Sequence, residues 1–334
     1  MRAAFFTYPS AFQNVGGGEV LLLKLKEYLE KEGMRVDFFD SWHAKVEDYD
    51  WLHVFGSVKD CLGLVRVANA RKVKVAITPL LWTDWSSGPF LRHLTKMIYP
   101  RFPSDRRELL LRSDLIFPNS ETEKGHLERF FALPPGKMKV VYNGVDEKFA
   151  RSGPSLFTSR FGNGPFVLSV GRIEPRKNQL NLIRAVKKTG KKLVLIGSAV
   201  SGYENYGERC RKEGEGFTVF LPTLAHEDPM LGSAYAACEL FVLPAWFETP
   251  GLAALEAALA GAKLLVTKGG STREYFKHYA EYLDPSNVED IRRKILSAIQ
   301  NAPPEGLRSH ILERYTWKPI AQATRRFYEE AAHA

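Results

Sequence analysis

Residues 240–257, which read Leu-Phe-Val-Leu-Pro-Ala-Trp-Phe-Glu-Thr-Pro-Gly-Leu-Ala-Ala-Leu-Glu-Ala, have the pattern of a buried strand followed by a helix. The run 240–243 is short and entirely apolar, which is typical of a strand inside a parallel sheet. Thr249 is a favourable helix N-cap, and Pro250 suits the first helical position because its missing N–H has no intrahelical partner there. The sequence therefore predicts a helix that begins near Pro250.

The start of this predicted helix is a candidate anion site. Its first turn would leave the amides of Gly251, Leu252 and Ala253 without intrahelical partners, at the positive end of the helix dipole. Two carboxylates, Glu248 and Glu256, flank this turn with seven residues between them. They would repel a phosphate unless they face neutral hydroxyls, so the combination suggests a sugar nucleotide. The alternative is structural: a buried Glu256 paired with an arginine and an exposed loop charge at Glu248.

Composition bounds the class of protein. A chain of 334 residues with 45% hydrophobic and 12% aromatic residues is large enough for two domains with their own cores. The net charge of +9 is spread over both halves. Nucleic-acid binding therefore rests on charge alone and is a weak alternative, because anionic small molecules or a membrane surface explain the charge equally well.

Cysteines and hydropathy bear on the compartment. Cys61, Cys210 and Cys238 are too few and too scattered for a disulfide framework or a metal cluster, which fits a reducing cytoplasm. No apolar run approaches the roughly 20 residues that span a bilayer. We therefore expect a cytoplasmic protein that is soluble or peripheral at the inner face of the membrane.

Apolar runs alternate with amphipathic segments, which predicts parallel α/β sheets. Two sets of strands are expected, at 3–7, 35–39, 52–55, 73–78, 115–118 and 139–142, and at 166–170, 193–196, 218–221, 240–243, 263–267 and 281–283. Residues 149–165 are rich in Gly, Ser and Pro and form the predicted linker. The sequence thus predicts two doubly wound domains, 1–150 and 151–316, and a final helix within 317–334 that packs back on the first domain.

A second candidate site follows the predicted strand 166–170. The sequence there continues Gly171-Arg172-Ile-Glu-Pro-Arg-Lys177-Asn178, and Asn178 is the expected cap of the next helix. Cations at the carboxyl end of a parallel strand lie where open sheets bind ligands, so Arg172 and Lys177 could neutralise a diphosphate. The alternative is a solvated basic loop without a ligand.

Three motifs together resemble glycosyltransferase family four: Gly171-Arg172-Ile-Glu-Pro-Arg-Lys177-Asn, Glu248-Thr-Pro-Gly-Leu-Ala-Ala-Leu-Glu256-Ala, and Tyr142-Asn-Gly-Val-Asp146. Their order and spacing match across most of the chain. The resemblance implies a GT-B architecture, in which two Rossmann-like domains face each other across a cleft and the C-terminal domain holds most of the donor. It also implies retaining glycosyl transfer.

The resemblance assigns roles to individual residues. Arg172 and Lys177 would bind the diphosphate, Glu256 the nucleotide ribose and Glu248 the transferred sugar. The amides after Pro250 would contact phosphate or sugar. The remaining donor-binding candidates are glycines and a serine at strand or helix ends, namely Gly17, Gly18, Gly171, Gly197 and Ser198. We expect no metal and no cofactor besides the nucleotide-diphosphate sugar, which is a co-substrate.

The first predicted domain contains two features to compare with the family: a glycine-rich segment before a helix and the position of a family histidine. Gly16-Gly17-Gly18-Glu19 precedes a predicted helix at 20–31, and its amides could face the donor phosphates, although an ordinary flexible turn is equally compatible. Glu19 is expected to be a helix-start charge. Many family members have a His after the fourth strand, where this chain reads Thr78-Pro79-Leu80. His53 lies in another predicted strand and is expected to be a core residue.

Without that His, no side-chain general base is assigned. The phosphate of the donor itself could accept the acceptor proton, while Arg172 and Lys177 stabilise the leaving charge. The sequence predicts a metal-independent retaining hexosyltransferase that acts on an unknown hydroxyl acceptor. The alternatives are a nucleotide-sugar epimerase or phosphorylase of the same fold, and a non-catalytic paralogue that binds sugar nucleotides or polyanions.

The segment 89–114 is a candidate membrane or acceptor contact. It carries six basic residues interleaved with apolar and aromatic ones, which could touch an anionic membrane or a lipid-linked acceptor. Pro100 and Pro103 interrupt any amphipathic helix, so a mobile acceptor-side element with a solvated face is the favoured alternative. No nucleic-acid partner is expected.

Overall fold

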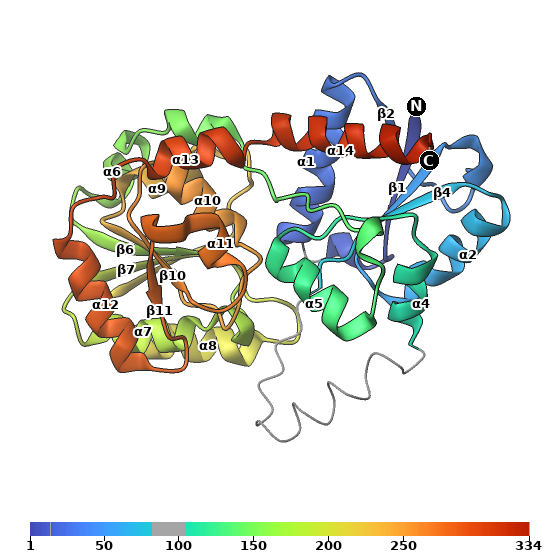
Figure 1. Ribbon diagram of the computed structural model, residues 1–334. Coiled ribbons are helices and arrows are strands. Elements are labelled where there is room, and N and C mark those ends of the chain that lie inside the picture. The colour runs from blue at the N-terminus through green and yellow to red at the C-terminus, as the bar shows by residue number, and fades with distance from the viewer. Residues whose placement is uncertain (14, 82–103, 334) are drawn as a thin grey trace. The chain divides into compact units, whose positions relative to one another are not determined.

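The computed structural model describes residues 1–13, 15–81 and 104–333, which form two compact units (Figure 1). One unit comprises Met1–Asn143 together with Trp317–Ala334, and the other comprises Gly144–Thr316. The division thus falls after Asn143, whereas the sequence suggested residue 150. No helix in these described ranges is both long and apolar enough to cross a membrane.

The first unit is built on a five-stranded sheet in the order β2-β1-β3-β4-β5, with all neighbouring strands parallel. This is one of the two common orders of doubly wound α/β domains. Its strands are β1 (Arg2–Thr7), β2 (Arg35–Phe38), β3 (Trp51–Phe55), β4 (Lys74–Thr78) and β5 (Leu115–Ile116). Its helices are α1 (Gly17–Lys31), α2 (Leu62–Ala70), α4 (Asp105–Arg112), α5 (Glu121–Phe131) and α14 (Trp317–Ala332), with short turns η1 (Ala11–Gln13), η2 (Val46–Asp48), η3 (Lys59–Cys61) and η5 (Pro135–Lys137).

The strand predicted at 139–142 is absent. Met138 forms only an isolated bridge to Ile116, and the chain then follows β5 through the amide of Lys139, which donates to the carbonyl of Ile116. β5 itself ends at Ile116, two residues before Pro118, whose nitrogen has no hydrogen to donate. An apolar run beside a two-residue edge strand therefore remains irregular.

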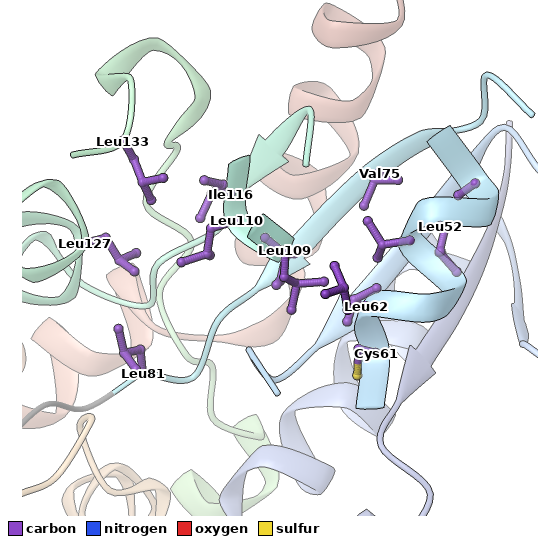
Figure 2. Packing of buried hydrophobic residues seen from close by; sticks show 14 of the residues in the cluster. Leu52, Cys61, Leu62, Val75, Leu81, Leu109, Leu110, Ile116, Leu127 and Leu133 are labelled. Atoms are coloured by element: carbon purple, nitrogen blue, oxygen red, sulfur yellow. The ribbon is translucent and has the colours of Figure 1, made fainter. Parts of the chain in front are cut away.

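Figure 2 shows the core on one face of this sheet, where leucines of α2, α4 and α5 pack on β3, β4 and β5. Leu109 and Leu110 of α4 are completely buried there. Burying a leucine contributes about 1.5–3 kcal/mol, so this layer is a main source of stability for the unit. Among the labelled residues, Leu81 lies at the end of the described chain that follows β4.

The opposite face of the same sheet is covered by α1 and α14, which lie side by side in Figure 1. Trp317, Ile320 and Tyr328 of α14 join the core formed by α1 and the strands. The ring of Tyr328 lies 4.9 Å from that of Trp51. The last helix is therefore an integral layer of the first unit, because its apolar face is buried against α1 and the sheet.

The second unit contains a six-stranded sheet in the order β11-β10-β9-β6-β7-β8, again parallel throughout. This is the Rossmann order. From β6 the strands β7 and β8 are added on one side, and β9, β10 and β11 are then added on the other side, so the strand order reverses between β6 and β9. Its strands are β6 (Phe166–Val170), β7 (Lys192–Ile196), β8 (Thr218–Leu221), β9 (Leu240–Leu243), β10 (Leu264–Thr267) and β11 (Glu281–Leu283). All were expected from the sequence, and the fold class of two doubly wound α/β domains is confirmed.

Helices cover both faces of this sheet. They are α6 (Ser155–Phe161), α7 (Gln179–Lys187), α8 (Glu204–Glu213), α9 (Pro229–Ala237), α10 (Leu252–Leu259), α11 (Thr272–Phe276), α12 (Val288–Gln300) and α13 (Leu307–Arg314), with turns η6 (Glu147–Arg151), η7 (Pro175–Lys177) and η8 (Lys277–Tyr279).

One local expectation is corrected. The predicted linker 149–165 contains α6, which packs on α9 through the buried Phe157. Elsewhere in the unit, Asn287 caps α12, and its side chain accepts from the amides of Glu289 and Asp290.

Candidate functional site

Lys177 and Glu248 come together at the carboxyl ends of β6 and β9. Lys177 Nζ lies 2.5 Å from Glu248 Oε1, and only 16% and 6% of the two side chains are exposed. These strands flank the point where the strand order reverses, which is where open α/β sheets bind ligands. The residues that the sequence assigned to diphosphate and sugar thus form a buried ion pair in the free protein. Burial lowers the pKa of Lys177 below its ordinary value, although Glu248 acts in the opposite direction.

Sequence reasoning missed two further members of this cluster. Arg176 NH1 lies 3.6 Å from Glu248 Oε1, and Arg176 NH2 lies 3.1 Å from Glu174 Oε1. Arg172 NH2 reaches the same oxygen of Glu174 at 3.4 Å. Local spacing did not identify these contacts, because Arg176 lies in the turn η7 and reaches Glu248 in a different loop.

The cluster has an unbalanced charge. Three cations, Arg172, Arg176 and Lys177, face two carboxylates, Glu174 and Glu248, which leaves one net positive charge (3 − 2). Both of these cation contacts of Glu248 use Oε1. Its Oε2 atom is therefore available to accept from a hydroxyl, while the surplus cation favours an anion.

Gly197 allows the backbone at the end of β7 to pack closely against the backbone at the end of β6. Its φ of +151° favours glycine, and a Cβ at this position would lie only 2.0 Å from the carbonyl oxygen of Gly171, so no side chain fits. The amide of Gly171 donates to Ile196, and that of Ile173 donates to Ser198. Gly171, Gly197 and Ser198 therefore lie in one turn beside Arg172, and Gly197 has a packing reason to be glycine. Their contacts with a donor remain a prediction.

Ser198 continues this surface toward β8. Its amide donates to Thr223 Oγ1 at 3.0 Å, and the amide of Thr223 donates to Ser198 Oγ at 3.1 Å. Both residues are exposed. The reciprocal pair joins the ends of β7 and β8 beside the donor-binding candidates Gly197 and Ser198.

The start of α10 differs from the sequence expectation. The helix begins at Leu252 with Gly251 as its N-cap, two residues later than predicted, and Thr249 and Pro250 precede it. Gly251 has a φ of +89°, a conformation that supplies a turn before the helix. Gly251, Leu252 and Ala253 are each half-buried. Gly251 still lies beside Glu248, because a Cβ added to Gly251 would be 3.4 Å from Glu248 Oε2.

Glu248 is also held through its backbone. It pairs with Gly270, its amide donates to the carbonyl of Gly269, and its carbonyl accepts from the amide of Ser271. A Cβ on Gly270 would lie 1.9 Å from the Glu248 carbonyl oxygen, so only glycine permits this approach. The contact comes from the turn after β10, which the sequence had not linked to the site.

Glu256 has neutral and ionisable neighbours instead of an arginine. It is 6% exposed, and its Oε2 accepts from the Tyr235 hydroxyl at 2.7 Å. Its Oε1 lies 3.3 Å from Nδ1 of His226. The structural alternative of a Glu256–arginine pair is therefore wrong. No signal in the sequence connected these two residues to Glu256.

Asn178 was expected to cap α7 through its side chain. It occupies the N-cap position, but its side-chain amide donates to the carbonyls of Pro244 and Pro285 instead. This fixes the loop of η7 to the end of β9. The correction strengthens the structural link between the Lys177 and Glu248 loops.

Gly17 and Gly18 belong to the first unit, where they open α1. Glu19 accepts from the amide of Gly16 at 2.7 Å and is buried, as expected for a helix-start charge. A Cβ on Gly18 would lie 3.1 Å from Leu80, in the segment where the family His is replaced. These glycines thus form a well-packed helix start, and their donor contacts remain a prediction.

His53 is a core residue. It is completely buried, with Nε2 2.8 Å from Thr78 Oγ1 and Nδ1 2.5 Å from the Tyr328 hydroxyl. Burial lowers its pKa to about 3, so it is neutral at physiological pH. Its two ring nitrogens are occupied within the fold.

Most of segment 89–114 lies outside the described residues. Within the described part, Arg106 donates to the Ser57 carbonyl, Arg107 to the Phe131 carbonyl and Arg112 to Glu108. These three arginines have intramolecular partners, and the membrane contact stays a prediction.

One group among the described residues has metal-ligand chemistry. Atoms of Asp146, His226 and Glu227 lie within 4.8 Å of one another. Lys148 Nζ lies 2.5 Å from Glu227 Oε2, so a cation of the protein already neutralises this carboxylate.

The geometry agrees with what known proteins share with this chain. The family model for glycosyltransferase family 4 matches residues 40–149, and the model for glycosyl transferases group 1 matches residues 157–314. Both models describe glycosyltransferases. The chain belongs to glycosyltransferase family four.

Curated relatives have related names. The D-inositol 3-phosphate glycosyltransferase of Segniliparus rotundus is 28% identical over 245 residues, which is 69% of this chain and 52% of the relative. An O-antigen chain mannosyltransferase B of Escherichia coli is 28% identical over 58% of this chain and 54% of its own length. The chain thus spans about half the length of these relatives.

Solved structures share the fold. HepE of Anabaena, crystallised with UDP, superposes with a TM-score of 0.79 at 18% identity, over 99% of this chain and all of HepE. Sucrose-phosphate synthase of Thermosynechococcus elongatus gives a TM-score of 0.75 at 17% identity, with 98% of each chain covered. At these identities the likeness concerns the GT-B type of fold.

Proposed function

We propose that this protein is a retaining, metal-independent glycosyltransferase. It moves a hexose from a nucleotide-diphosphate sugar to a hydroxyl acceptor, which is a sugar, a lipid-linked glycan or a small molecule. The proposal rests on family membership and on one observation above all. That observation is the charge cluster of Arg172, Arg176, Lys177 and the buried Glu248 at the point where the strand order reverses.

The cluster suits a departing diphosphate. When the bond between the sugar and the phosphate lengthens, negative charge grows on the phosphate oxygen that leaves, and pre-positioned cations stabilise it without reorganisation. Arg172 and Lys177 carry that role, and the amides at the start of α10 add further donors. Glu248 contacts Lys177 through Oε1 and uses its Oε2 atom for a hydroxyl of the transferred sugar.

The acceptor proton goes to an oxygen of the donor phosphate in this proposal, because no side-chain base is assigned in the first unit. His53 is neutral, buried and already engaged. The bond to the acceptor then forms on the face from which the nucleotide departs, which retains the configuration of the anomeric carbon.

The deciding experiment is a donor panel. Calorimetry with UDP, GDP and ADP sugars measures binding, with UDP-glucose first because HepE has been crystallised with it. Release of free nucleotide in the presence of candidate acceptors then measures transfer. We expect Lys177→Ala to abolish tight binding, whereas Lys191→Ala, which removes a pair with Glu239 at the amino ends of β7 and β9, leaves it intact.

Each alternative gives a different result. An epimerase changes the sugar without releasing nucleotide, a phosphorylase requires inorganic phosphate, and a non-catalytic paralogue binds without turnover. An inverted anomeric product contradicts the retaining mechanism. Loss of turnover with EDTA that Mg²⁺ restores contradicts metal independence. If no nucleotide sugar binds, the proposed function is wrong.

The cellular location is proposed from the chemistry of the donor. Nucleotide sugars are made in the cytoplasm, and a reducing compartment fits the three free cysteines. Cosedimentation with anionic vesicles tests peripheral association, which we place at 89–114. Binding that persists after the basic residues of 89–103 are neutralised contradicts that assignment.

A further inference from the structure

Two side chains from outside α10 hold the carboxylate of Glu256. The Tyr235 hydroxyl of α9 donates to Oε2 at 2.7 Å, and His226 Nδ1, from the loop between β8 and α9, lies 3.3 Å from Oε1. Each oxygen therefore has one protein neighbour. A carboxylate has about four acceptor positions in all, so one position on each oxygen is left.

Both neighbours are fixed by the surrounding structure. The ring of Phe149, in η6, packs edge-on against His226 at 5.4 Å and against Tyr235 at 5.8 Å. Lys148 Nζ donates to the carbonyl of His226 at 2.8 Å. Tyr235 is completely buried, and burial followed by the charge of Glu256 raises its pKa well above the ordinary value. Its hydroxyl therefore keeps the proton that it donates to Glu256.

The environment of His226 selects its tautomer. Nε2 is buried and has no hydrogen-bond partner within the described part of the chain. A hydrogen on Nε2 would be an unsatisfied buried donor, which costs about 1–3 kcal/mol. The ring therefore carries a proton on Nδ1, where it faces Oε1 of Glu256. Both side chains thus present a hydrogen to the same carboxylate.

We propose that His226 and Tyr235 are positioning residues that make Glu256 selective for ribose over deoxyribose in the donor nucleotide. The inference rests on the proposed function, in which Glu256 contacts the ribose. A ribose offers two adjacent hydroxyls, O2′ and O3′, and the held carboxylate keeps one free acceptor position on each oxygen. Removing either neighbour lets the carboxylate rotate, so the loss falls on the hydroxyl contacts and leaves the diphosphate contacts unaffected.

The test compares dissociation constants for UDP, GDP or ADP, whichever binds in the donor panel, with those for its 2′-deoxy analogue. The ratio of the two constants measures ribose selectivity and cancels contributions from base and diphosphate. We expect Tyr235→Phe and His226→Ala each to lower this ratio by roughly two- to tenfold, the worth of one hydrogen bond. The 2′-deoxy nucleotide keeps O3′, so its affinity should fall by less than that of the ribonucleotide.

Two further variants separate positioning from general damage. His226→Asn keeps a donor near the Nδ1 position and should restore most of the ratio. Tyr282→Phe removes a hydroxyl that donates to the Lys277 carbonyl elsewhere in the same unit, and should leave the ratio unchanged.

Three results would overturn the inference. The first is an unchanged ratio in both Tyr235→Phe and His226→Ala. The second is an equal loss of affinity for the ribo- and deoxynucleotide, which would indicate a purely structural role. The third is a wild-type protein that binds both nucleotides equally well. Failure of the wild type to bind any nucleotide in the panel is a separate outcome, because it refutes the proposed function itself.

Discussion

Replacing Glu248 by glutamine tests whether this carboxylate is the counter-charge of Lys177 and Arg176 in the absence of a diphosphate. The substitution keeps the size of the side chain and removes its negative charge, so the buried Lys177 and the nearby Arg176 lose their shared counter-charge. The net charge of the five-residue cluster then rises from +1 to +2 (3 − 2 becomes 3 − 1).

The magnitude follows from burial. Breaking a buried ion pair by removing one partner costs about 3–5 kcal/mol. The Lys177 side chain is still 16% exposed, so the lower end of that range applies and we expect a loss of about 3 kcal/mol in the free energy of unfolding. A bound diphosphate supplies the missing counter-charge. UDP should therefore stabilise the variant by about 1–2 kcal/mol more than it stabilises the wild type.

The assay is thermal unfolding with and without UDP and UDP-glucose, supported by calorimetric dissociation constants. The variant should gain more stability from UDP than the wild type, yet lose any extra affinity that the sugar provides. Glu239→Gln is the matched control, because it also removes the partner of a lysine, Lys191, at the amino ends of β7 and β9 in the same sheet. It should show neither effect.

The reasoning is refuted if Glu248→Gln responds to UDP like the wild type and still prefers UDP-glucose over UDP. A smaller stabilisation by UDP would equally contradict it, since that would mean that Glu248 assists the diphosphate. A GDP or ADP sugar replaces the UDP compounds if the donor panel selects one of them.

Three further outcomes are expected. Gly197→Ala should lower stability by several kcal/mol, since strain and a backbone clash add, whereas Gly162→Ala, with a φ of +89° and open space, should cost only the strain of about 1–3 kcal/mol in chemical denaturation. Burial raises the pKa of Glu123 to about 7 from 4.5, so its contribution of about 3 kcal/mol is present below pH 4.5 and lost as pH rises through 7; Glu123→Gln should abolish this part of the pH dependence of unfolding. Tyr328→Phe leaves His53 Nδ1 without its partner and should cost about 1–3 kcal/mol without changing nucleotide affinity; a large change in affinity would contradict the core assignment of His53.

Much of the fold could be predicted because parallel strands are short apolar runs whose signal is local. The strands from β6 to β11 are recognisable from their own residues, and the 139–142 run failed because strand formation also needs a neighbouring edge with paired donors. Helix ends were less predictable. Thr249 and Pro250 form a favourable helix start in isolation, yet the close approach of the Gly269–Gly270 turn to Glu248 holds the chain out of the helix until Leu252.

The sequence by itself determined the fold class, the family and the pair of loops that carry Lys177 and Glu248, because these depend on periodicity and on motifs contiguous in the chain. Only the tertiary structure decided the partners: Arg176 beside Glu248, and Tyr235 with His226 around Glu256. Contacts between elements depend on how sheets and helices pack, and this packing cannot be predicted from the spacing of residues along the chain. Packing brings Tyr235 and His226 to Glu256 instead of the arginine that the sequence had offered as an alternative, and the ribose contact of Glu256 stays a prediction.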